Sequence, residues 1–389
     1  MTTMSTIKTT ASSPPRRRHH SRHHRKGALN VLLRLVAPLT LCLAQPLLAA
    51  ELPTDLGQRL LTGYIQPAVA ELHRTGEKLS AALPAYCQAP GDSAHREAVD
   101  ARFRDLVAAW GRVELLRFGP LLERNRLERL FFFPDTRGVT QRQLSALLAV
   151  ADPAALDAGQ LAKRSVAVQG IPALDYLLYN SGASEQIASD EASGRYRCQL
   201  AAASARNLVA VSAELQQAWA GDTAFARQFV APGPQQPVYR SVGEVGTEAL
   251  KMLSTGLQLT RDIKLLPAVG ATIDSARGQR APLWRSQLTV ELLQANVRGL
   301  LDIYQATGFD AQLPAEERWI GENLVAEGER LLALLEEPLP PFERAVSEAE
   351  SREQLLYAIM LLKNLQAIVV EYLPPAFGVN IGFNSLDGD

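Results

Sequence analysis

Residues 205–219 read ARNLVAVSAELQQAW, a stretch in which Leu208, Val211, Leu215 and Trp219 recur at helical spacing. That spacing puts the apolar side chains on one face of an α-helix. Ala, Leu, Glu, Gln and Arg dominate the rest of the chain, and aromatic residues make up only 6% of it. Such a composition favours helices over strands. We therefore predict an all-α protein.

Further long amphipathic segments lie on both sides of this stretch. They cover residues 60–83, 94–116, 141–150 and 184–219, and then residues 242–266, 284–304, 316–335 and 347–373. The densest break between them is residues 231–237, APGPQQP, which is rich in helix-breaking residues. A chain of 389 residues is also too long for one comfortable core. The sequence therefore predicts two packed helical-bundle domains, residues 51–233 and residues 234–389.

The first fifty residues have the composition of an export signal. They contain eight Lys or Arg and no Asp or Glu, and an apolar stretch runs from Ala28 to Ala50. Small residues then precede Glu51, as signal cleavage requires. Arg34 and Pro38 interrupt the short apolar core, which argues against a stable transmembrane span after cleavage. We predict a signal peptide over residues 1–50 and a periplasmic or cell-envelope location, with an uncleaved anchor as the alternative.

The remainder of the chain is acidic and poor in histidine. From Glu51 onward it holds 32 Lys or Arg against 41 Asp or Glu. A surface of that sign repels phosphate backbones, which excludes nucleic acid as a leading partner. Only His73 and His95 lie beyond residue 50, and no His-Glu-x-x-His motif occurs. A His-rich metal site and a zinc-peptidase signature of that kind are therefore excluded.

Two cysteines, Cys87 and Cys198, lie beyond the predicted signal. An exported protein meets conditions that permit disulfides, so the two can form a bridge. The alternative is a pair of buried thiols, since free cysteine behaves as a small hydrophobic residue. Neither cysteine has a neighbouring histidine to act as a base, which disfavours a cysteine nucleophile.

Charged residues continue the apolar face of the segment around Trp110. The apolar positions of that face are Phe103, Leu106, Val107, Trp110 and Val113. Glu114 and Arg117 follow on the same face, three residues apart, where they can interact. We expect a structural ion pair between them.

A second place of interest is Asp175, the one charged residue between Ser165 and Ser184. Gly170 and Pro172 fit the start of a helix. Because the segment is apolar on nearly every side, it should be buried, and a buried carboxylate needs a partner. We expect Arg117 to be that partner. The pair is either a buried salt bridge or part of a ligand site.

Several stretches in order along the chain resemble the imelysin-like proteins of the bacterial envelope, over essentially residues 55–389. They are Trp110 to Pro120, Phe133-Pro134-Asp135, Gly170 to Tyr179, Asp262-Ile263-Lys264-Leu265, Trp284-Arg285-Ser286 and the closing Gly382 to Asp389. The resemblance implies two helical-bundle domains, an envelope location and an association with iron uptake.

The imelysin family is also classed as metallopeptidases, with Gly-x-His-x-x-Glu as the hallmark motif. Here that motif falls on residues 170–175, where Gly170 is kept, Pro172 stands in the place of the His and Asp175 in that of the Glu. Proline has no side-chain lone pair, so it cannot bind a metal. The site therefore departs from the family at the residue that matters most.

Three functions remain open. The first is a non-enzymatic envelope binding protein, linked to iron uptake, whose crevice between the two domains holds a small ligand, a metal or a partner protein, with Asp175, Glu114, Arg117 and Gly170 lining or bracing it. The second is a metallopeptidase, which is disfavoured because it needs a metal-activated water or a nucleophile. The third is a periplasmic scaffold. A carboxylate-only site for iron or another divalent metal stays possible, since oxygen ligands suit such ions.

Overall fold

The computed structural model describes residues 49–189 and 191–382. The predicted signal peptide, except for its last two residues, lies outside the described residues. The same holds for residues 383–389, where Asn384, Asp387 and Asp389 offer oxygen atoms but lack the pattern of a calcium loop. Residues from Leu48 onward form one compact unit. The division of that unit into domains at residues 233 and 234 stays a prediction.

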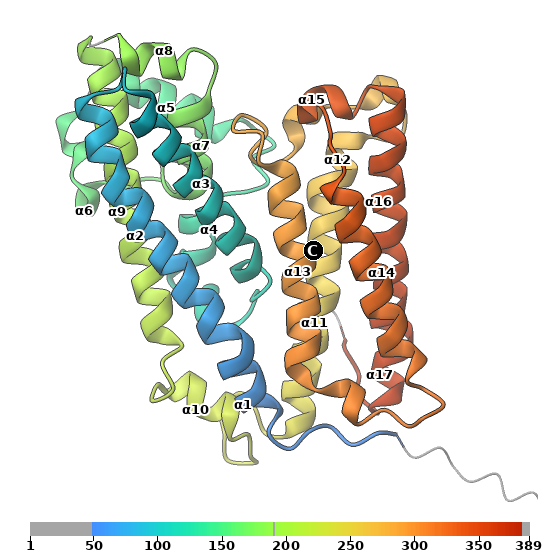
Figure 1. Ribbon diagram of the computed structural model, residues 1–389. Helices are drawn as coiled ribbons and strands as arrows, with labels where there is room; N and C mark the ends of the chain where they lie inside the picture. The colour runs from blue at the N-terminus through green and yellow to red at the C-terminus, as the bar shows by residue number, and fades with distance from the viewer. Residues whose placement is uncertain (1–48, 190, 383–389) are drawn as a thin grey trace, which may run out of the picture. The chain divides into compact units, whose positions relative to one another are not determined.

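Every regular element in the described residues is helical, which confirms the all-α prediction. Figure 1 shows one group of helices, coloured blue to yellow-green, that precedes the Pro-rich loop. Its members are α1 (Leu56–Leu60), α2 (Gln66–Gln88), α3 (Ser93–Val113), α4 (Arg126–Leu130), α5 (Val139–Val150), α6 (Ala158–Leu161), α7 (Gly170–Tyr179), α8 (Ala183–Ala188), α9 (Ala192–Ala218) and α10 (Ala224–Val230).

A second group, coloured yellow to red in Figure 1, follows that loop. Its members are α11 (Val242–Gln258), α12 (Leu266–Val269), α13 (Thr289–Thr307), α14 (Trp319–Glu336), α15 (Phe342–Ala345), α16 (Ala349–Ala367) and α17 (Leu373–Ala376). Three segments continue a helix in π geometry, namely η1 (Leu61–Ile65), η6 (Leu259–Leu265) and η10 (Ile368–Tyr372). Short 3₁₀ turns make up the rest: η2 (Gly119–Leu121), η3 (Glu123–Asn125), η4 (Pro153–Leu156), η5 (Val166–Val168), η7 (Ile273–Ser275), η8 (Gly278–Arg280) and η9 (Phe309–Ala311).

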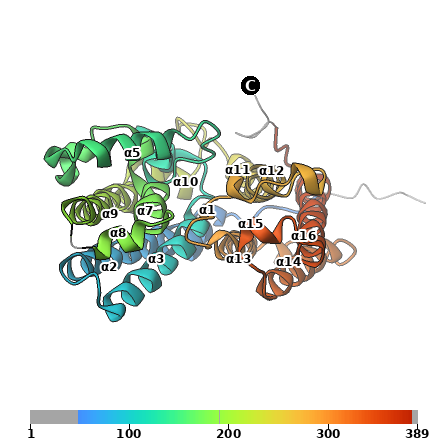
Figure 2. The ribbon, with the colours of Figure 1, turned by 90° about the horizontal axis from the view of Figure 1, so that it is seen from above.

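Two sets of long helices pack side by side. In the first group, α2 packs against α3 and α9. In the second group, α13 packs against α11 and α14, and α14 also packs against α16. Figure 2 shows the two groups next to each other, with α3 facing α13. Gly111 permits this approach, because a Cβ atom there would lie 2.6 Å from Cβ of Ala295. The face predicted around Trp110 is buried as expected.

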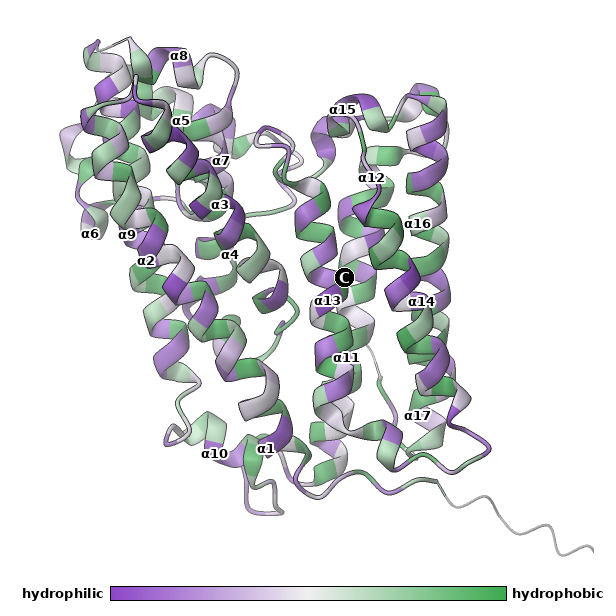
Figure 3. Cartoon of the chain, in the orientation of Figure 1, coloured by the Kyte–Doolittle hydropathy of each residue, from purple (hydrophilic) through white to green (hydrophobic). Residues whose placement is uncertain are grey.

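The hydropathy pattern explains the packing. Most long helices in Figure 3 carry hydrophobic residues on one side and hydrophilic residues on the other. Such helices bury the apolar side against a neighbour. One stretch, Ala349–Ala376, is long and apolar enough by composition to cross a membrane. Its Leu355, Leu361 and Leu362 are buried inside the unit, whereas Leu356 and Met360 are exposed.

Two of the predicted helices have different bounds. Residues 184–219 form α8 and α9 rather than one helix, and the segment predicted from Trp284 enters its helix only at Thr289. Residues before Thr289 form turns in which Leu283 and Gln287 adopt positive φ angles of 57° and 61°. Neither residue is Gly or Asn, so the sequence carries no sign of this turn.

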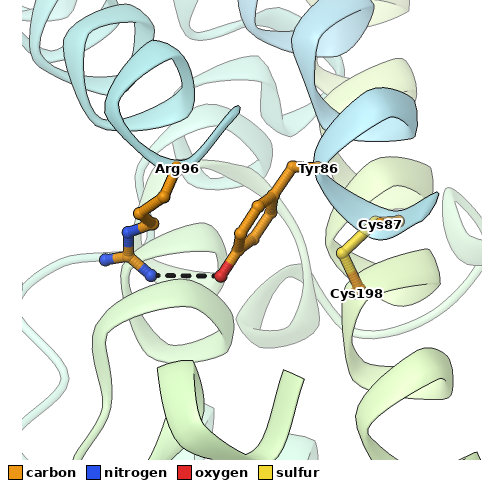
Figure 4. Close-up of a disulfide and its surroundings, with 4 residues drawn as sticks. All are labelled: Tyr86, Cys87, Arg96 and Cys198. Carbon is orange, nitrogen blue, oxygen red and sulfur yellow. Dashed lines mark hydrogen bonds between the residues drawn. A yellow bond between two sulfur atoms is a disulfide. The ribbon is translucent and has the colours of Figure 1, made fainter. Parts of the chain in front are cut away.

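A disulfide joins Cys87 at the end of α2 to Cys198 in α9, as Figure 4 shows. Cys198 is buried, and the neighbouring Tyr86 hydroxyl accepts a hydrogen bond from Arg96 at 3.3 Å. The bridge therefore fixes one end of α2 against the central helix of its group.

Removal of the disulfide should destabilise the chain. The bridge spans 111 residues, for which the chain-entropy model gives about 4–5 kcal/mol. We expect a Cys87→Ser/Cys198→Ser variant to have a free energy of unfolding lower by about that amount. It should therefore unfold at a lower urea concentration than the native chain. Reductant should lower the midpoint of the native chain and leave that of the variant unchanged. Identical midpoints for native chain and variant would show that the bridge does not stabilise the fold.

Candidate functional site

A fully buried lysine lies where the two groups of helices meet. The side chain of Lys264 has no exposed surface, and its ammonium group donates to Glu114. It also donates to Oδ1 of Asn296 at 2.6 Å. Asn296 in turn donates from Nδ2 to Oε1 of Glu114 at 2.8 Å and to the carbonyl of Gly111 at 2.6 Å. The three side chains therefore form a closed network, which we call the Lys264 network.

Each member of the Lys264 network comes from a different element. Glu114 directly follows α3, Lys264 belongs to the π segment η6, and Asn296 belongs to α13. Burial lowers the pKa of Lys264, and Glu114 opposes that shift. A buried ammonium group is tolerated only when its donors are used. The network therefore ties α3, η6 and α13 into one arrangement.

The expected ion pair of Glu114 with Arg117 is therefore wrong. Glu114 bonds to Lys264 and Asn296 instead. Arg117 acts on Glu114 only over a longer distance, and burial lowers its pKa. The spacing of three residues does not bring the two groups together because α3 ends at Val113, so the helical geometry that the argument assumed stops before Glu114.

Asp175 lies in the middle of α7, whose start depends on a glycine. Gly170 has a φ of +71°, and a Cβ there would lie 2.3 Å from the carbonyl oxygen of Leu130 at the end of α4. Only glycine allows both that conformation and that approach. Gly170 was predicted to bind a ligand, but in the structure it positions α7 against α4.

The partner of Asp175 is Arg285 and not Arg117. Oδ2 of Asp175 lies 3.8 Å from Nη1 of Arg285, and Oδ1 accepts a hydrogen bond from the backbone N–H of Ser286 at 3.0 Å. Asp175 is only 3% exposed. Burial raises its pKa to about 6, although Ser286 and Arg285 act in the opposite direction. The prediction of a buried carboxylate with a cationic partner holds, and the identity of the partner was wrong.

Asp175 and Arg285 belong to the wall of a cavity of about 460 Å³. One side of the cavity comes from residues 131–141 and α7, and the other from η6 and residues 279–285. Its wall is largely apolar, and Phe131, Phe133, Pro172 and Trp284 contribute to it. Arg285 lies over the Trp284 ring at 4.4 Å and over the Tyr176 ring at 5.3 Å. The cavity can therefore accommodate the apolar part of a ligand, and Arg285 can pair with a negative group on that ligand.

The carboxylates of this cavity do not fit a metal centre. Asp135 accepts the backbone N–H groups of Val139 and Thr140 at 2.8 and 2.7 Å, and so caps α5. Asp262 pairs with the adjacent Arg261 at 2.7 Å. Across residues 49–189 and 191–382, no three His, Cys, Asp or Glu side chains lie together as metal ligands would. The hypothesis of a carboxylate-only iron site therefore finds no matching residues here.

Of the predicted site residues, only Asp175 lines this cavity. Glu114 is a buried bridge, Gly170 is a packing residue and Arg117 faces a separate cavity. Sequence reasoning did not assign Lys264 or Arg285 a role. Both lie in short stretches on which the family resemblance rests. A charged residue inside such a stretch is a candidate site residue, and this criterion could have identified both.

Comparison with known proteins gives a consistent result. The family model described as Imelysin matches residues 63–369. Similar solved structures include an imelysin-like protein from Psychrobacter arcticum, at 18% identity and a TM-score of 0.71, covering 86% of this chain and all of that one. Another, from Parabacteroides distasonis, is described as a "putative iron-regulated protein A precursor". It has 10% identity and a TM-score of 0.66, and the match covers 82% of this chain and 95% of that one. A search of curated proteins finds no match.

The raised pKa of Asp175 predicts a pH dependence of stability. The unfolded carboxyl group ionises near 3.8 and the folded one at about 6. Between these values the folded state holds the additional proton, so the free energy of unfolding falls as pH rises through this range. An Asp175→Asn variant has no carboxyl group at this position, so its free energy of unfolding does not fall for this reason as pH rises. The stability of this variant relative to the native chain should rise by about 2 kcal/mol from about pH 4 to about pH 7, measured by urea unfolding.

The exposed Asp222 provides a matched control. An Asp222→Asn variant should follow the pH dependence of the native chain. The assignment fails if Asp175→Asn follows it too.

The Lys264 network predicts a large effect of a single substitution. Lys264→Met leaves Glu114 buried without its cation, which should lower the free energy of unfolding by about 3–5 kcal/mol. Urea unfolding at neutral pH measures this loss, and Lys363→Met at an exposed position serves as control. A second substitution, Glu114→Gln, should restore part of it because the unpaired charge is removed. A loss no larger than that of the control would show that the network does not hold the helices together.

Proposed function

The chain belongs to the imelysin family, and from that premise we propose that it is an exported, non-enzymatic binding protein of the cell envelope. In this proposal the protein acts in an iron-linked process and holds a small organic ligand in the cavity of about 460 Å³. The observation that carries the proposal is the pairing of an apolar, aromatic wall with the half-buried cation Arg285.

Export is supported by three observations. Residues 1–50 have the basic, then apolar, then small-residue order of a signal peptide. The disulfide between Cys87 and Cys198 suits an oxidising compartment. The Parabacteroides protein is described as a precursor and as iron-regulated, which supports both export and the link to iron.

The chemistry of the cavity favours an anionic ligand with a flat apolar body. A guanidinium group has five N–H donors. In the described part of the chain, Asn180 and Gln141 accept from Arg285 at 3.1 and 3.4 Å, and Asp175 lies at the longer distance of 3.8 Å. Donors are therefore left for a ligand oxyanion, and Arg280 adds a second cation to the wall. Trp284 and the Phe side chains can pack against the ligand's rings.

A peptidase is the weaker alternative because of the residues present. Hydrolysis of a peptide needs an activated water or nucleophile. Pro172 has no group that can hold or deprotonate water, and Asp175 is held by Arg285 and Ser286. The other carboxylates of the wall are engaged as well, because Asp135 caps α5 and Asp262 pairs with Arg261. These contacts favour residues that bind and orient a ligand.

An aromatic sulfonate tests the proposed function. Anilinonaphthalene sulfonate combines flat rings with an anion, and its fluorescence rises in an apolar site. We expect saturable binding of one probe per chain. Trp284→Ala and Arg285→Gln should each weaken it about tenfold, because each removes one ring or charge contact.

Arg240→Gln, at an exposed arginine, is the matched control and should leave the affinity unchanged. Circular dichroism checks that each variant keeps its helices. Equal affinity in all variants would show that the probe binds outside this cavity, and it would count against the proposal.

A further inference from the structure

A second and smaller cavity lies between the end of α3 and α11. Its volume is about 120 Å³, and Leu115, Arg117 and Phe118 form one wall. Glu248, Lys251 and Thr255 of α11 belong to the opposite wall. The two cavities share no lining residue. This second cavity is therefore separate from the proposed ligand site.

Arg117 enters this cavity without a full set of partners. Its Nε atom is buried, and no hydrogen-bond acceptor for it occurs among the described residues. Burial lowers the pKa of Arg117, against the attraction of Glu114 and Glu128. A buried donor without an acceptor carries a desolvation penalty that a bound acceptor would remove. The guanidinium group is therefore available to an anion.

The wall of this cavity carries two cations, Arg117 and Lys251, and one carboxylate, Glu248. Lys251 adds a second cation to the wall, and Lys264 is a neighbouring third. Against them stand two enclosed carboxylates, of which Glu114 is already bonded to Lys264.

The other carboxylate is Glu248. Burial raises the pKa of Glu248, whose Oε2 accepts a hydrogen bond from the Tyr239 hydroxyl at 3.1 Å. Glu128 is exposed, so solvent screens its charge. Glu248 attracts Lys251 of the same helix, so one carboxylate of the wall faces the two cations Arg117 and Lys251.

We propose that this cavity binds a small oxyanion, held between the guanidinium group of Arg117 and the ammonium group of Lys251. A guanidinium fork matches two oxygens of a carboxylate or phosphate, and an ammonium group adds a compact charge. The volume of about 120 Å³ suits phosphate or a short carboxylate and is too small for the aromatic ligand of the first cavity. The bound anion would join α11 to the residues after α3 by charge-assisted hydrogen bonds.

Calorimetric titration of the purified full chain tests the proposal. Inorganic phosphate, acetate and chloride are titrated separately at constant ionic strength. We expect one saturable site for phosphate or acetate, and weaker binding of chloride because a single atom cannot use the guanidinium fork. Arg117→Gln and Lys251→Gln should each weaken the oxyanion about tenfold or more. Lys363→Gln, at an exposed lysine of the same group of helices, should bind as the native chain does.

Each outcome decides the proposal. No saturable site in the native chain, equal affinity for chloride, or unchanged affinity in the variants would overturn it. If Arg117→Gln does not fold, Lys251→Gln decides, because Lys251 lies on the half-exposed wall outside the Lys264 network. Anilinonaphthalene sulfonate binding is measured on the same variants. Its retention in Lys251→Gln shows that the loss is confined to the second cavity.

Discussion

Lys264 has no contact with solvent, so its ammonium group depends on acceptors from the protein itself. Glu114 supplies the opposite charge, and Asn296 fills the space between them and bonds to both. These side chains come from three separate elements. Movement of any of them would leave a buried charge without its hydrogen-bond partner. The close approach of α3 to α13, which Gly111 allows, brings Glu114 and Asn296 within reach of each other. Each cavity is lined by residues close in sequence to this contact, namely Asp262 and Ile263 in the larger one and Leu115 and Arg117 in the smaller one.

The helical class and the buried faces could be predicted from the sequence, because side-chain periodicity is a local property. The faces around Trp110 and Leu208 are buried as their spacing indicated. The need of Asp175 for a cation also followed from the apolar residues around it. The choice of that cation could not be predicted. Arg285 lies in a turn that uses positive φ angles at Leu283 and Gln287, and no Gly or Asn marks such a turn in advance.

Pro172 lies in the wall of the larger cavity. Pro172, which the resemblance places at the histidine position of the motif, contributes an apolar ring to the cavity wall beside Phe131, Phe133 and Trp284. Asp175, at the other end of the motif, is held by Arg285 and by the backbone N–H of Ser286. Both changes favour the binding of an organic molecule by packing and by an arginine.

The π segment η6 also affects how this chain can be compared with its relatives. A π turn holds more residues than an α turn, so the helix formed by α11, η6 and α12 contains residues that a regular helix of the same length would not. Lys264, which reaches the core, and Asp262, which lines the cavity, both lie inside this π segment. A relative whose helix is regular here would be out of register by about 100° for each extra residue. An alignment with such a relative is correct only if it opens a gap inside a helix, where alignments ordinarily avoid one.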